Sequence, residues 1–211
     1  MTGAARAAEP GTLFFDTLSP VTSVQLQIFK GRGFKGVGRY LENLTDDEVA
    51  EIHGEGLFIV PITEARIIPP SPGAGDDAGA LEVDRARSRG IPQGVHLTID
   101  NEAVHGTAEE DVEYIDAFSL RFARAAYGGM LYVAEPQPLT GPQMYARPNV
   151  DRYWSGASRN PEPDCGYTCG YTCFQGLPID YRPPWCPSAQ VDLDIIFADR
   201  LGRTPVVWCP A

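Results

Sequence analysis

Two carboxylates close a strand-like run near the middle of this sequence. The run from Gly94 to Glu102 reads GVHLTIDNE, with apolar residues at every second position and then two acids, Asp100 and Glu102. Side chains two apart in an extended strand lie on one face. If the strand extends through residue 102, both carboxylates therefore point the same way. Two carboxylates within reach of one sugar ring can hydrolyse a glycosidic bond, one as the acid and one as the stabiliser of the cationic transition state.

Other strand-like runs also end in charged side chains. The run from Leu13 to Phe15 is followed by Asp16, residues 57–63 are followed by Glu64, and the run from Val191 carries Asp192 and Asp194. In a barrel of parallel strands, the carboxyl ends meet at one rim, where active sites are assembled. Crowding of like charges raises the proton affinity of at least one acid. The predicted catalytic residues are Asp16, Asp100, Glu102 and Asp192. The alternative is that each acid caps a helix or pairs with an arginine such as Arg39.

The elements that must position these acids alternate between strand and helix. Helix-start signals occur at Ser19-Pro20, at Thr45 to Glu48 and at Thr107 to Glu110. The expected strands are 13–15, 34–40, 57–63, 94–102, 130–134, 150–154, 173–175 and 191–197. This alternation favours parallel strands joined by helices. We predict an α/β fold, a compact TIM-type (β/α)8 barrel over residues 12–211, preceded by a short N-terminal extension, 1–11.

Proline and glycine concentrate in two segments, 69–79 and 161–187. We expect residues 65–75 to form a loop at the active rim, before a helix over 76–89. Residues 156–187 are expected to form an irregular insertion rich in Cys, Pro and Gly. The tail that contains Val206, Val207 and Trp208 is expected to pack on the outside of the barrel.

All five cysteines lie in the last quarter of the chain, so full internal pairing would leave one over. The immediate repeat CGYTCGYTC favours a disulfide staple within residues 165–186 under oxidising conditions. A spacing of three residues without a nearby histidine disfavours zinc, and free thiols are the remaining alternative. The disulfide candidates are Cys165, Cys169, Cys173, Cys186 and Cys209. We expect no metal and no cofactor, and we expect His53, His96 and His105 to have structural roles.

Charge and hydropathy exclude several classes of function. The 211-residue chain has 28 acidic and 17 basic residues, for a net charge of −11, so phosphate backbones repel it and nucleic-acid binding is excluded. No apolar run is long enough to span a bilayer. Residues 1–10 lack the apolar core of a secretory signal, so we expect no export by the general route.

Four ordered motifs carry a family resemblance. They are Phe15 to Pro20 (FDTLSP), Gly36 to Leu41 (GVGRYL), Leu44 to Val49 (LTDDEV) and Gly56 to Pro61 (GLFIVP). In this order they resemble the DUF1906 group of bacterial glycoside-hydrolase-like barrels, over residues 12 to about 200. That group is similar in fold to the family 25 lysozymes, which cut the sugar backbone of peptidoglycan.

The resemblance implies roles for individual residues. Asp16 matches the aspartate of the first lysozyme strand, and residues 100–102 match the Asp-x-Glu motif, which makes Glu102 the general acid/base and Asp100 the partner of the substrate's acetamido group. Residues 191–194 resemble the closing Val-Asp-Leu-Asn, which points to Asp192. Together with the strand-end residues, the expected substrate-binding set is Arg39, Tyr40, Glu64, Tyr132, Trp154 and Gln175. The aromatic members either stack on sugar faces or belong to the core.

The resulting functional prediction is a glycoside-hydrolase-like protein of the lysozyme or muramidase type that acts on cell-wall peptidoglycan. The alternative is a non-catalytic barrel that binds cell-wall glycan or is a structural part of a phage particle or injection assembly, together with other proteins. We expect delivery to the wall by a phage particle, an injection device or lysis, and otherwise a cytoplasmic location.

Overall fold

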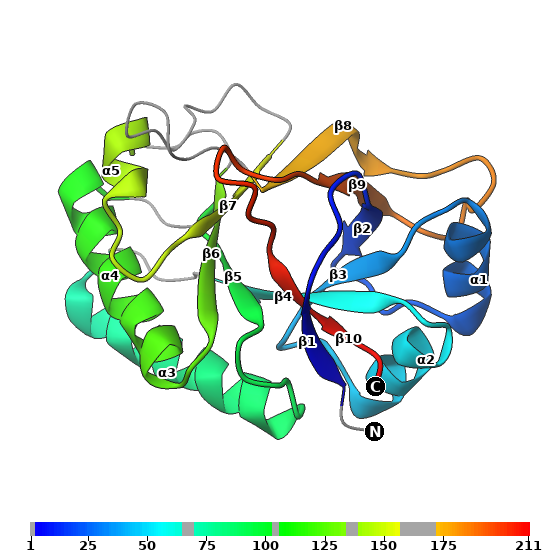
Figure 1. Ribbon diagram of the computed structural model, residues 1–211, viewed down its shortest axis with the longest axis horizontal. Coiled ribbons are helices and arrows are strands. Elements are labelled where there is room, and N and C mark those ends of the chain that lie inside the picture. The colour runs from blue at the N-terminus through cyan, green and yellow to red at the C-terminus, as the bar shows by residue number, and fades with distance from the viewer. Residues whose placement is uncertain (1–2, 65–69, 103–105, 134–138, 157–171) are drawn as a thin grey trace.

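The computed structural model describes residues 3–64, 70–102, 106–133, 139–156 and 172–211. Within them, ten strands form one curled, mixed sheet, and five helices pack against it (Figure 1). The strands are β1 Ala4–Ala7, β2 Leu13–Thr17, β3 Gly36–Tyr40, β4 Phe58–Glu64, β5 His96–Asp100, β6 Gly128–Val133, β7 Arg152–Ser155, β8 Cys173–Tyr181, β9 Val191–Ile196 and β10 Val206–Cys209. The helices are α1 Ser23–Gly31, α2 Asp46–Gly54, α3 Pro72–Ser88, α4 Ala108–Arg124 and α5 Gly141–Tyr145.

The strand order differs from the expected barrel of eight parallel strands. Successive strands from β2 to β8 pair in parallel, but β9 lies antiparallel between β8 and β2. Strand β4 pairs with both β3 and β5, so the hydrogen-bonded pairings from β2 to β9 return on themselves. The prediction of an α/β fold is confirmed. The (β/α)8 architecture is wrong, because the sheet is mixed and the described residues contain five helices.

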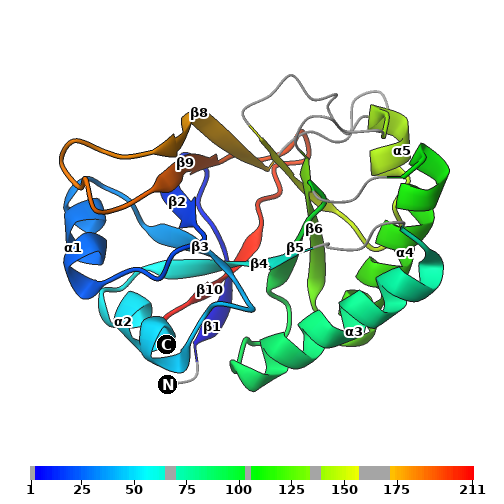
Figure 2. The same ribbon diagram turned by 180° about the vertical axis from the view of Figure 1, so that it is seen from behind.

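Side-chain alternation along the strands divides the core into two layers. Outward-facing residues such as Phe15, Val37 and Leu131 belong to the core that also contains residues of the helices. Inward-facing residues such as Phe14 and Met130 form a second cluster inside the curled sheet. Helices α1 and α2 lie beside β2 to β4, and α3 to α5 lie beside β5 to β7, as both views show (Figures 1 and 2). A residue's place in the strand therefore decides whether it can reach the interior of the sheet.

Helix boundaries follow the capping residues, with two corrections. The capping box of Thr107 is confirmed, since its hydroxyl accepts from Glu110 N and the Glu110 side chain accepts from Thr107 N. Helix α1 is capped by Thr22, three residues after Ser19. Helix α3 begins at Pro72 behind the cap Ser71, so most of the expected loop over 65–75 that the structure describes belongs to a helix.

The glycines of α3 explain why this segment is a helix and not a loop. An added Cβ atom on Gly75 would collide with the carbonyl oxygen of Tyr114, and one on Gly79 would lie 2.6 Å from the carbonyl oxygen of Phe118. These glycines therefore permit close packing of α3 on α4. A Gly-rich stretch that indicates a turn in the sequence is in fact a helix–helix contact.

The C-terminal part is more regular than expected. Residues 173–181 form β8 within the segment predicted to be an irregular insertion, and the tail forms β10, which pairs with β1 and with β4. Val207 joins the inner cluster and Trp208 the outer core, so the expectation that this tail packs only outside is wrong. The N-terminal extension, 1–11, contributes β1 to the same sheet.

Candidate functional site

Three aspartates occupy the inner face at the carboxyl ends of the parallel strands, and a fourth, Asp194, lies deeper, opposite Phe14 of β2. Asp16 of β2 lies directly opposite Asp192 of β9 in the antiparallel register, a position that brings Cβ atoms to about 5 Å. Asp194 lies two residues further along β9, and Asp100 is the last residue of β5. The charges of Asp192, Asp100 and Glu102 all act on Asp16. The four predicted catalytic residues therefore converge.

Glu102 reaches this group from a turn and not from a strand. Strand β5 ends at Asp100, so the expected alternation does not extend to residue 102. The backbone N–H of Glu102 donates to Asp100 Oδ1 at 3.1 Å, and the Glu102 side chain is exposed. Its charge nevertheless helps to raise the pKa values of Asp16 and Tyr132. Glu102 is thus the acid at the open edge of the cluster, and Asp100 is buried.

Two tyrosines hold the acids in place. The hydroxyl of Tyr40 donates to Asp100 Oδ2 at 2.7 Å. The hydroxyl of Tyr132 donates to Gln175 Oε1, and Gln175 Nε2 in turn donates to Asp192 Oδ2. Burial, followed by the charges of the acids, raises the pKa values of both tyrosines, so the hydroxyls stay protonated and remain donors.

Crowding has the effect on proton affinity that the sequence predicts. Burial and then the charge of Asp192 raise the pKa of Asp16 well above the ordinary value for an aspartate. The charges of Asp100 and Glu102 add to this, while a hydrogen bond with Asp194 opposes it. At least one member of the cluster therefore stays protonated to a higher pH than a solvated aspartate.

Asp194 is a site residue that the sequence reasoning does not select. Its side chain is 2% exposed, and its Oδ1 accepts a hydrogen bond of 3.1 Å from the indole nitrogen of Trp154. The signal is present in the sequence, because the two acids of β9 are spaced by two and a strand places both on one face. Asp192 is the member of this pair that both the strand-end pattern and the resemblance select.

Two of the expected substrate-binding residues are buried, and the side chain of a third is not described. Arg39 is fully buried, with Nε 2.8 Å and Nη2 3.2 Å from the Glu48 carboxylate and Nη1 bonded to Thr17 O. It faces away from the interior because Tyr40, next to it, faces inward, so its predicted role is wrong. Trp154 is 1% exposed and packs edge-on against Phe14, which leaves no face for a sugar. The side chain of Glu64 lies outside the described residues.

The described cysteines do not form the expected staple. Cys173, Cys186 and Cys209 are free thiols, and Cys165 and Cys169 lie outside the described residues. Cys173 lies on β8 and Cys209 on β10, two strands that are not neighbours in the sheet. No group of three or more potential metal ligands occurs in the part of the chain that the structure describes.

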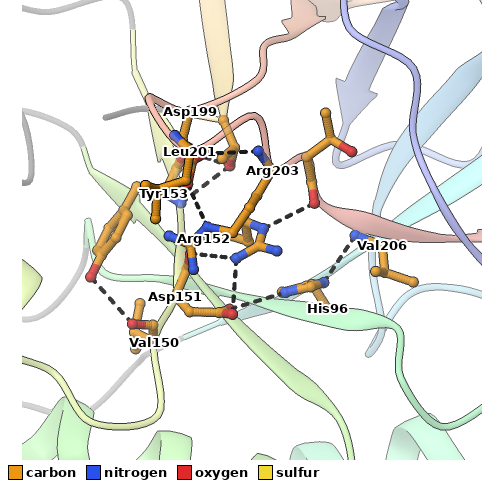
Figure 3. A network of polar contacts seen from close by, with 11 residues as sticks. His96, Val150, Asp151, Arg152, Tyr153, Asp199, Leu201, Arg203 and Val206 are labelled. Atoms are coloured by element: carbon orange, nitrogen blue, oxygen red, sulfur yellow. Dashed lines mark hydrogen bonds and ion pairs between the residues drawn. The ribbon is translucent and has the colours of Figure 1, made fainter. Parts of the chain in front are cut away.

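A second polar network lies at the opposite ends of the strands (Figure 3). The N–H of Val206 donates to His96 Nδ1 at 2.9 Å, so Nε2 carries the ring proton and faces Asp151 Oδ1 at 3.1 Å. Arg152 contacts Asp151 at 2.9 Å and donates to Thr204 O at 2.9 Å. Asp199 and Arg203 form a neighbouring ion pair of 2.8 Å. His96 is therefore structural.

The remaining histidines fit this interpretation as far as the structure describes them. The ring of His53 is buried, with Nε2 3.3 Å from the carbonyl oxygen of Trp208. Burial lowers its pKa. His105 lies outside the described residues.

Comparisons with known proteins show similarity in structure only. No known protein family and no curated protein matches the sequence. An uncharacterized protein of B. stearothermophilus superposes with a TM-score of 0.71 at 24% identity, over 88% of this chain and 96% of that one. A family 25 glycosyl hydrolase from Bacillus anthracis superposes with a TM-score of 0.61 at 10% identity, over 89% of each chain.

Two further neighbours are an endolysin domain and an autolysin. The catalytic domain of endolysin ply40 from bacteriophage P40 of Listeria monocytogenes has a TM-score of 0.55 at 12% identity, over 90% of this chain and 94% of that one. The autolysin LytC from Streptococcus pneumoniae, solved with a synthetic peptidoglycan ligand, has a TM-score of 0.61 at 12% identity. That match covers 89% of this chain and 47% of LytC. The chain therefore has a fold similar to that of family 25 hydrolases. No helix among the described residues is long and apolar enough to cross a membrane.

Proposed function

We propose that this protein hydrolyses the glycan of bacterial peptidoglycan, as a muramidase-type glycosidase. The observation that carries the proposal is the convergence of Asp16, Asp100, Glu102 and Asp192 at the carboxyl ends of the strands. The fold is similar to that of a family 25 glycosyl hydrolase and of an endolysin catalytic domain, which supports the same function. Membership of the DUF1906 group remains part of this proposal.

The catalytic role proposed for each acid follows from its exposure and its hydrogen bonds. Glu102 is the exposed member and acts as the general acid that protonates the leaving oxygen. Asp100, fixed by Tyr40, orients the acetamido group of the substrate. Asp192, held by Gln175, and Asp16 supply negative charge beside the cationic transition state.

Digestion of purified peptidoglycan tests the proposal. Wild-type protein and the Glu102→Gln variant are compared by the release of new reducing ends, with Glu109→Gln, an exposed carboxylate on α4, as the matched control. We expect Glu102→Gln to lose cleavage by about 10²–10⁴-fold, the usual contribution of a general acid. Glu109→Gln should cleave like the wild type. A Glu102→Gln variant that cuts at the wild-type rate contradicts the assignment.

A second candidate function is a non-catalytic module that binds cell-wall glycan, alone or within a phage particle or injection assembly. The observation that favours it is the position of Glu102, which lies in an exposed turn outside the strands that hold the other acids. Co-sedimentation with purified cell walls separates the two functions. Binding without new reducing ends supports the module, and shortening of the glycan supports the enzyme. In either case the wall is reached by phage, injection device or lysis.

A further inference from the structure

The carboxyl of Asp194 lies in surroundings that an ionised carboxylate does not fit. One oxygen, Oδ1, accepts from Trp154 Nε1 at 3.1 Å. The other, Oδ2, is buried and accepts no hydrogen bond from a donor group in the described part of the chain. The carboxyl of Asp16 lies beside that of Asp194, close enough for a hydrogen bond between the two side chains. Ionised carboxylates only accept hydrogen bonds, so this contact requires a proton on one of the two residues.

The groups around Asp194 favour the proton on this residue. Asp192 faces it from the same strand, Tyr132 from β6 and Cys173 from β8, together with Asp16 from β2. None of these four groups is positively charged at any pH. Burial, then the charge of Asp16 and that of Asp192, raise the pKa of Asp194, and the Trp154 indole opposes them only in part. Asp16 is less buried, and the hydrogen bond from Asp194 works to lower its pKa.

We infer that Asp194 holds a proton in the folded protein and donates it in a hydrogen bond to the Asp16 carboxylate, as a positioning residue beneath the proposed site. The pair then carries one negative charge where two aspartates would carry two. The hydrogen bond fixes the orientation of the Asp16 carboxylate. The role in positioning rests on the proposed function, whereas the retained proton does not.

Replacement of Asp194 by asparagine tests whether the aspartate is protonated in the folded protein. The side chain in Asp194→Asn would have the same shape, with an amide N–H to donate to Asp16 and an oxygen to accept from Trp154. Asp194→Asn therefore reproduces the protonated aspartate at every pH. Asp192→Asn is the matched control, because it removes one charge from the same strand and leaves the Asp194–Asp16 contact in place.

Urea unfolding at a series of pH values shows whether the pKa of Asp194 is raised in the folded protein. A raised pKa in the folded state contributes stability that is complete below the unfolded pKa, about 3.9, and is lost as the pH rises through the folded pKa. Over that window the unfolding equilibrium constant of the wild type should rise relative to Asp194→Asn, by up to about tenfold per pH unit. Asp192→Asn should keep most of the wild-type slope. Equal slopes for wild type and Asp194→Asn overturn the inference.

Infrared difference spectroscopy provides a second readout that does not depend on unfolding. At pH 7 the wild type minus Asp194→Asn spectrum should contain the C=O stretch of a protonated carboxylic acid. The wild type minus Asp192→Asn spectrum should contain carboxylate bands instead. Absence of the protonated band from the first spectrum contradicts a retained proton.

Glycan cleavage separates this inference from the proposed function. If the wild type cleaves peptidoglycan, Asp194→Asn should move the alkaline limb of the pH profile upward, and Asp194→Ala should lose activity that Asp194→Asn restores. An unmoved alkaline limb overturns the positioning role. If the wild type does not cleave, the proposed function and the positioning role fail together, and the unfolding and infrared measurements still decide whether Asp194 is protonated.

Discussion

The two ends of the curled sheet carry polar clusters of opposite design. At the carboxyl ends, Asp16, Asp100 and Asp192 gather with Glu102 above the buried Asp194, and Asp100 and Asp192 accept hydrogen bonds from the neutral side chains of Tyr40 and Gln175. At the amino ends, Asp151 and Asp199 are paired with His96, Arg152 and Arg203 (Figure 3). In the contacts described for these residues, the first cluster brings acids together and the second pairs acids with basic side chains.

The difference separates a site from a structural network. Balanced pairs with matched donors and acceptors fix the β9–β10 connection against β5 and β7 and stabilise the native state. A cluster of like charges works against folding, and such clusters with raised pKa values are typical of functional sites. Changes at the carboxyl ends should therefore affect activity, and changes at the amino ends should affect stability.

The largest expected effect is on catalysis at the carboxyl ends. Asp100→Asn should lower peptidoglycan cleavage by about 10²-fold, because the carboxylate that orients the substrate becomes a neutral amide. Its free energy of unfolding should stay equal or rise, since a like charge has been removed from the cluster. Reducing-end release and urea unfolding on the same sample test both statements. A variant that is inactive only because it unfolds refutes this division of roles.

The next effect is on stability at the amino ends. Arg152→Met should lower the free energy of unfolding by about 2 kcal/mol, because Thr204 O and Asp151 lose a charged donor. Cleavage per folded molecule should not change. The exposed pair of Arg89 with Asp46 provides the control, Arg89→Met, for which we expect less than about 1 kcal/mol. Loss of activity in folded Arg152→Met would show that the two ends are not independent.

Removal of one like charge from the acidic cluster should be stabilising. Asp192→Asn places a neutral side chain opposite Asp16, and like charges directly opposite each other in a sheet cost up to about 1 kcal/mol. At pH 8, where the aspartates carry most charge, the free energy of unfolding of Asp192→Asn should be higher than that of the wild type. The same measurement at pH 4 should show a smaller gain. A loss of stability at pH 8 would mean that the bond from Gln175 outweighs the repulsion.

The smallest expected effect concerns acid pH and has the opposite sign to that of Asp194. Burial works to raise the pKa of Asp151, but the hydrogen bond with His96 and the charges of Arg152 and Arg203 outweigh it and leave the pKa below the ordinary value. Asp151 therefore contributes stability above the unfolded pKa, about 3.9, that is lost as the pH falls through the folded pKa. The side chain is 53% exposed, so Asp151→Asn should lower the free energy of unfolding by less than about 1 kcal/mol at pH 7. The variant should also lose less stability than the wild type as the pH falls through the acid range. An unchanged acid limb would show that the pair contributes nothing.

The sequence alone was enough to place most strands and to predict that Asp16, Asp100, Glu102 and Asp192 lie near one another. Parallel strands with inward carboxylates at their ends follow from a period of two and from acids after apolar runs, and both features are local. Side chains alternate between the two faces of a strand, so the positions of Asp194 and Arg39 in their strands already indicate that Asp194 faces inward and Arg39 outward. Each was missed because a strand-end position was given more weight than alternation.

Other features depended on tertiary contacts. The antiparallel setting of β9, the pairing of β10 with β1, and the helix over the glycines of α3 depend on partners far away in the chain. The same holds for protonation. An aspartate acquires a raised pKa only from burial and from charges that the fold brings next to it, so Asp192 and Asp194 look alike in the sequence. Only the folded sheet, by burying Asp194 against Asp16 and Trp154, makes them different.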